Sequence, residues 1–72
     1  MTKGVAKNGD GLMIKSYDID KEKVEFTTEV KDAYNFGGLG EMEANNEIDF
    51  IKHHLTEQHG ELETMAYAVV PY

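Results

Sequence analysis

The chain of 72 residues contains no cysteine and no arginine, and each absence excludes a class of structure or partner. Without cysteine it can form neither a disulfide nor a thiolate metal cluster, so a small apolar core must supply its stability. Arginine is the side chain that best matches phosphate groups and guanine edges, because its guanidinium donates two parallel hydrogen bonds. A chain that lacks arginine and carries a net charge of −7 is a poor candidate for direct nucleic-acid binding.

Long apolar runs are also missing. No stretch approaches the roughly 18 residues of a membrane span, and the N-terminal MTKGVAKNGDG lacks the apolar centre of a secretory signal. The sequence therefore predicts a cytoplasmic protein that does not enter a membrane. An apolar content of 40%, with four tyrosines and three phenylalanines, favours a folded chain over intrinsic disorder. We expect residues 1–72 to form one small domain.

Negative charge is concentrated in the second half of the chain. Residues 1–23 carry five lysines and four acidic residues, and residues 24–40 carry one lysine and three acidic residues. In residues 41–72, Lys52 is the single base among seven acidic residues. This distribution indicates an acidic surface in the second half that would attract a partner with a basic surface.

Three segments have the composition of β-strands. GLMIKSYDI (11–19) and KVEFTT (23–28) flank the polar DIDKE, which predicts an antiparallel hairpin. LETMAYAVV (62–70) ends at Pro71, and both of its faces are apolar, which favours a position near the centre of the sheet. Residues 1–10 form either a short extra strand before the turn-forming KNGDG or a flexible tail.

Two segments have helical spacing. In 27–36, Val30, Ala33 and Tyr34 are spaced i, i+3, i+4, which predicts one or two helical turns with Thr28 as the N-cap. The main helix is expected from Glu41 to about residue 58, with Gly60 as the left-handed residue after its end. Its core-facing stripe should consist of four apolar residues, Ala44, Ile48, Ile51 and Leu55.

The elements in this order predict an α+β fold. We expect a small two-layer sandwich, in which an antiparallel sheet of three to four strands has the main helix (about 41–58) packed on one face. The order along the chain is (β)ββ-short α-α-β, where the bracketed strand is the optional one within residues 1–10.

The acidic and histidine residues near the end of the main helix could bind a divalent metal. Asp49, His53 and Glu57 are spaced i, i+4, i+8 and would form one row on the helix, with His59 as a further candidate ligand. The same spacing also produces ordinary acid–histidine pairs, and a histidine at a helix C-terminus is favoured by the dipole. Acid–histidine pairs on a helix surface are the simpler explanation of this pattern, so we expect no metal or other cofactor. Metal binding stays an alternative.

Catalysis has little support in the sequence. Cysteine is absent, and Ser16 is the only serine, on a predicted strand without the sharp turn that exposes a nucleophile. His53 and His54 do not fit the HExxH pattern of a metalloprotease. The sequence therefore predicts a protein that is not an enzyme.

Phe50 is the most informative residue of the main helix. It lies about 120–160° from the centre of the core stripe, so it is either the edge of a wide core or an exposed anchor. Exposed aromatic side chains carry much of the affinity of protein interfaces. We therefore predict a protein-binding site made of Phe50 and three surrounding acidic residues, Glu43, Glu47 and Glu57.

The run MIKSYD…KVEFTTEVKDAYNF…EIDFIKHHL resembles small accessory proteins from phages and prophages of Gram-positive bacteria. In that resemblance a strand pair is followed by a turn at Thr28, Ala33 and Phe36, and then by a helix. The resemblance implies a non-enzymatic, protein-binding role in the cytoplasm of a bacterial host.

Two more specific interpretations remain open. In one, the acidic helix mimics a nucleic acid and inhibits a host protein that handles nucleic acids. In the other, the chain forms a homo-oligomer, and a second copy covers the sheet face opposite the helix. The apolar residues on both faces of 65–70 motivate the homo-oligomer.

Overall fold

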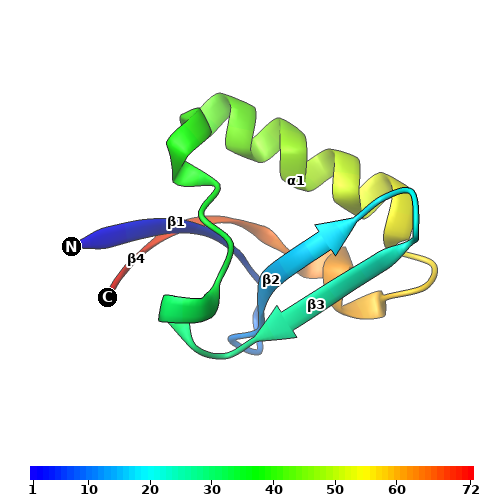
Figure 1. Ribbon diagram of the computed structural model, residues 1–72, viewed down its shortest axis with the longest axis horizontal. Helices are drawn as coiled ribbons and strands as arrows, with labels where there is room; N and C mark the ends of the chain where they lie inside the picture. The colour runs from blue at the N-terminus through cyan, green and yellow to red at the C-terminus, as the bar shows by residue number, and fades with distance from the viewer.

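The computed structural model describes residues 1–72, except for the side chain of residue 39. It confirms the predicted α+β class, since one helix lies across a four-stranded antiparallel sheet (Figure 1). The main elements are β1 (Thr2–Lys7), β2 (Met13–Asp18), β3 (Lys23–Thr27), α1 (Glu41–Leu55) and β4 (Ala66–Pro71). Three short 3-10 helices connect them: η1 (Val30–Asp32), η2 (Gly37–Leu39) and η3 (Gly60–Thr64). In the described part of the chain, no helix is long and apolar enough to cross a membrane.

The strands are arranged in the order β3-β2-β1-β4, and every neighbouring pair is antiparallel. Residues 1–10 therefore contain a central strand, β1, and not a flexible tail. The predicted central position of the C-terminal strand is wrong, because β4 pairs with β1 alone and lies at an edge. Its two apolar faces have another explanation: Tyr67 packs in the core under α1, and Val70 packs against a smaller cluster on the opposite face.

The β1–β2 turn depends on the side chain of Asn8. Its Oδ1 accepts hydrogen bonds from the amides of Asp10 and Leu12, each at 3.0 Å. Its Nδ2 donates to the carbonyl of Glu61 at 3.4 Å, and the residue is only 8% exposed. The side chain thus organises the turn from within and ties it to η3.

Replacing Asn8 with alanine should lower the free energy of unfolding by about 1–3 kcal/mol, because two turn amides lose their acceptor. Urea denaturation followed by circular dichroism measures the change. Gly9→Ala is the control in the same turn, since nothing lies within 4 Å of a Cβ at Gly9. Equal effects of the two substitutions would show that the turn amides do not depend on Oδ1.

Beyond their turn, β1 and β2 separate, and the segment 33–37 lies in the gap between them (Figure 1). Lys7 and Met13 are the only residue pair in register between the two strands. The segment hydrogen-bonds to both strands; on β2 the amide of Tyr34 donates to the carbonyl of Ile14 at 2.9 Å. It therefore takes the place of missing strand–strand pairs.

The same segment passes from one face of the sheet to the other. Ala33 packs in the cluster on the face away from α1, whereas Phe36 is fully buried in the core under α1. Between them the chain crosses the gap, and the amide of Phe36 donates to the carbonyl of Gly4 on β1 at 2.8 Å. The connection to α1 thus contributes two buried side chains, Ala33 and Phe36, although the residues between them are exposed.

The helix predicted in 27–36 is reduced to the single turn of η1. Thr28 is not its N-cap; Glu29 holds that position and makes no side-chain capping bond. Ala33 is extended, with φ −70° and ψ 142°, because the following amides pair with β2 and β1 and not with a preceding helical turn. Tertiary hydrogen bonds therefore override the local helical spacing.

The predicted stripe of α1 is buried, and each of its four residues is at most 2% exposed: Ala44, Ile48, Ile51 and Leu55. The helix ends at Leu55, three residues before the predicted end. The carbonyl of Leu55 accepts bonds from the amides of Gln58 and His59, which close the last turn. Gly60 begins η3, so its predicted role as the left-handed residue after the helix is wrong.

Candidate protein-binding surface

Phe50 lies on the outer face of α1 and is 47% exposed, so it is not the edge of the core. Its position follows from helical periodicity, because the buried stripe occupies the opposite side of the helix. The ring rests against the imidazole of His54, one turn further along, with ring centroids 4.3 Å apart and planes inclined at 32°. This contact holds the ring against the helix with much of its surface open to solvent.

A shallow hollow lies beside Phe50. Its remaining walls are the side chains of Glu43, Asn46 and Glu47, which precede Phe50 by seven, four and three residues. These spacings place all four side chains on one side of the helix. A basic or amphipathic side chain of a partner could enter the hollow, contacting the ring on one side and carboxylates on the other.

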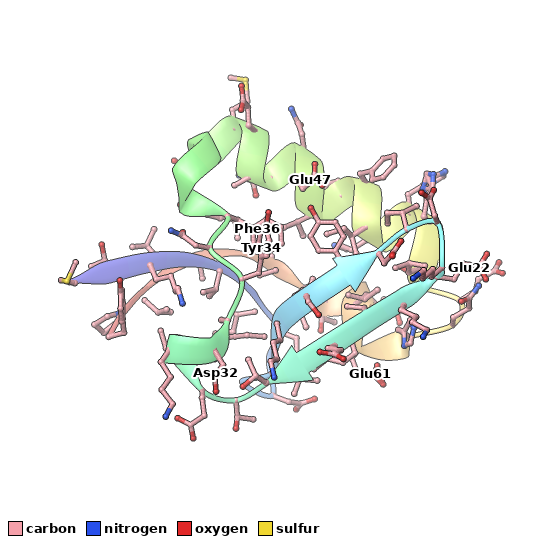
Figure 2. All side chains as sticks on the ribbon, in the orientation of Figure 1. Glu22, Asp32, Tyr34, Phe36, Glu47 and Glu61 are labelled. Carbon is pink, nitrogen blue, oxygen red and sulfur yellow. The ribbon has the colours of Figure 1, made fainter. Side chains whose placement is uncertain are left out.

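Glu47 is hydrogen-bonded to the sheet that packs under α1. The hydroxyl of Tyr17, on β2, donates a hydrogen bond to its Oε1. Burial raises the pKa of Tyr17, and the hydrogen bond and negative charge of Glu47 raise it further, so the hydroxyl remains a donor. In Figure 2, Glu47 lies on α1 above Tyr34 and Phe36, whose rings pack on Tyr17 with centroids 5.5 and 6.1 Å away. The acidic wall is therefore anchored on an aromatic cluster.

The outer face of α1 keeps its negative charge because Lys52 points elsewhere. Lys52 is the only lysine in residues 41–72. Its Nζ donates to the carbonyl of Met65 at 3.1 Å, on the flank of the helix that packs toward β4. Glu43 and Asp49, both exposed, therefore have no lysine partner supplied by their own helix.

The structure brings together three of the four residues predicted for protein binding. Phe50, Glu43 and Glu47 surround the hollow, whereas Glu57 lies in the turn after α1 and is not part of it. Sequence reasoning missed the contribution of His54. Its i, i+4 spacing from Phe50 was the available signal, because aromatic side chains at this spacing meet on a helix surface.

The candidate metal ligands do not converge. Across the residues that the structure describes, no three histidine or carboxylate side chains are arranged to hold a metal ion. His53 packs against the ring of His54, with centroids 5.3 Å apart, and Glu57 falls beyond the end of α1. His59 packs edge-on against Phe26, 6.1 Å away, so its ring is turned toward β3.

A second hollow, of about 360 Å³, lies at the end of the β2–β3 hairpin. Ser16 opens onto it, but its hydroxyl donates to Glu25 Oε2 at 3.2 Å. The walls carry both signs of charge and consist of Ser16, Tyr17, Asp18, residues 21–25 and His59. None of the predicted protein-binding residues contributes to it.

Comparisons with models of protein families, with characterised proteins and with solved structures gave no match.

Proposed function

We propose that this chain is a non-enzymatic, acidic protein-interaction module, and that the outer face of α1 binds a partner with a basic surface. The observation that supports this most directly is Phe50, an aromatic side chain 47% exposed beside a hollow with carboxylate walls. Aromatic anchors supply much of the affinity of protein interfaces, and surrounding charges steer and accelerate association.

The resemblance to phage and prophage accessory proteins fits this proposal, because it implies a protein partner in a bacterial host. The partner could be a host protein that normally binds nucleic acid, since such proteins present basic grooves to phosphate groups. In that case the acidic helix would mimic a nucleic acid. The exposed acidic residues of α1 and the absence of arginine favour such a mimic over direct contact with nucleic acid.

Capture from a bacterial lysate with the immobilised chain tests the proposal. The wild-type chain should retain one or more proteins, and Phe50→Ala should reduce their amount about tenfold or more, because the anchor is lost. Met42→Ala is the matched control, since Met42 is 78% exposed on the same helix but does not line the hollow. Quantitative mass spectrometry of the eluates measures the difference.

Salt separates the contributions of the anchor and of the charges. At high salt the capture should weaken if carboxylates attract the partner, because exposed charges are screened beyond about 3 Å at 1 M salt. Capture unchanged by salt would count against an electrostatic mimic. Equal capture by the wild-type chain and Phe50→Ala would contradict the proposed surface altogether.

A further inference from the structure

The two edges of the sheet differ in a way that points to a second interface. At one edge, β3 (KVEFT) carries Lys23 and Glu25, and charged side chains of this kind discourage strand pairing. At the other edge, β4 (AYAVVP) carries no charge over its whole length, and Val69 is 60% exposed. An uncharged, apolar edge of this length is a template for another strand.

The direction of the backbone groups of β4 follows from its register with β1. Beside the pair of Thr2 and Pro71, the amide of Tyr72 donates to the carbonyl of Met1 at 3.0 Å. Hydrogen-bonded and non-hydrogen-bonded pairs alternate along an antiparallel ladder. The backbone groups of residues 66, 68 and 70 therefore face β1, and those of residues 67, 69 and 71 face the open edge.

The only proline of the chain fits this pattern. Pro71 has no N–H and lies at a position that faces the open edge, so the β1–β4 ladder loses no hydrogen bond. Tyr67 and Val69 each present a donor and an acceptor to the open edge. Among the described residues, no strand other than β1 pairs with β4.

We propose that the open edge of β4 pairs antiparallel with β4 of a second copy of this chain, with Ala68 opposite Ala68 of that copy. In this register Tyr67 lies opposite Val69 of the second copy, and the reverse pair follows by symmetry. All donors and acceptors of these two residues are then matched in four hydrogen bonds. Registers centred on Tyr67 or on Val69 would bring residue 65 or the donorless Pro71 into the ladder.

Side chains and charge favour a copy of the chain in this place. Tyr67 and Val69 point to the same face of the sheet, and the ring of Tyr67 leans over Gly4 on β1. The exposed Val69 of each copy would therefore pack beside the Cβ of Tyr67 of the other copy. The chain carries a net charge of −7, yet β1 and β4 together contain Lys3 and Lys7 and no acidic residue. This edge is therefore a place where two acidic chains can meet with little repulsion.

Sedimentation across a range of concentrations tests the pairing. Because the contact is limited to one strand pair, the wild-type chain should form a weak dimer that dissociates on dilution. Val69→Pro removes the outward N–H of each copy and no bond to β1, so it should raise the dimer dissociation constant about tenfold or more. Val69→Thr, which keeps the N–H and the branched shape, should dimerise as the wild-type chain does.

Disulfide trapping tests the register independently of proline. The chain has no cysteine, so a single introduced thiol reports only contacts between copies. Residues opposite each other in a non-hydrogen-bonded pair have Cα atoms about 4.5 Å apart, within the range of a disulfide. Ala68→Cys should therefore form a covalent dimer in a glutathione redox buffer, whereas Ala66→Cys, which faces Val70 of the second copy, should not.

Three results would overturn the proposal. A wild-type chain that remains monomeric at millimolar concentration would exclude a second copy and leave the edge to a strand of another protein. If Val69→Pro does not weaken the dimer, the dimer interface lies elsewhere on the molecule. Equal trapping of Ala68→Cys and Ala66→Cys would exclude the register, and circular dichroism of each variant checks that it is folded.

Discussion

Phe36→Ala is expected to remove about 3–5 kcal/mol of the free energy of unfolding, the range found when a fully buried aromatic ring is deleted. Phe36 is 0% exposed, although it lies in a connection and not in a strand or α1. Its ring packs against Tyr34 and Tyr17, with centroids 4.8 and 6.1 Å away. A chain of this length has a total stability of about 4–11 kcal/mol, so this change removes a large part of it.

Urea denaturation followed by circular dichroism measures this loss. Tyr34→Ala is the matched control, because Tyr34 belongs to the same aromatic group but is 41% exposed. It should cost less than half as much as Phe36→Ala, since its ring gives up less buried surface. Similar losses in the two variants would contradict a core centred on Phe36.

The sequence was sufficient for the elements whose side chains alternate regularly. The i, i+4, i+7 spacing in α1 predicted all four of its buried residues, because a helix packed on a sheet buries one stripe. The β2–β3 hairpin followed from the alternation in residues 23–28 and from the polar turn before them. In both cases the information is local, since it lies within one element or in the short turn between two strands.

The sequence was insufficient where hydrogen bonds over long range decide the structure. Residues 27–36 have helical spacing, but the amides of Tyr34 and Phe36 pair with Ile14 and Gly4, which are distant in the chain. The edge position of β4 was missed for a related reason. The apolar residues on both faces of β4 show that each face packs against other side chains. They carry no information on how many strands pair with the two edges of β4.

Helical spacing predicted three of the four residues of the candidate surface and could not predict the contacts that depend on other elements. Phe50, Glu43 and Glu47 come together because one helix places them at fixed spacings. Glu57 falls outside because α1 ends at Leu55, and helix ends depend on local hydrogen bonds that periodicity does not report. The bond between Glu47 and Tyr17 joins residues 30 positions apart, so spacing along one element could not reveal it.

Gly4→Ala should destabilise the protein by about 1–3 kcal/mol, the usual cost of adding atoms to a packed core. A Cβ at Gly4 would lie 2.5 Å from the hydroxyl oxygen of Tyr67 and 2.6 Å from its Cε1. The ring covers the glycine from the neighbouring strand β4. The backbone cannot shift easily to relieve the contact, because β1 pairs with β4 on one side and bonds to Phe36 on the other.

A double-mutant cycle with Tyr67→Ala identifies the cause. If the collision with the ring is responsible, Gly4→Ala should cost nothing in the Tyr67→Ala background. It could even stabilise by about 0.4–1 kcal/mol, because alanine restricts the unfolded chain. Gly9→Ala is the control, since nothing lies within 4 Å of a Cβ at Gly9, and its effect should stay within about 0.5 kcal/mol. An equal cost of Gly4→Ala in both backgrounds would show that the strand backbone, and not Tyr67, requires glycine.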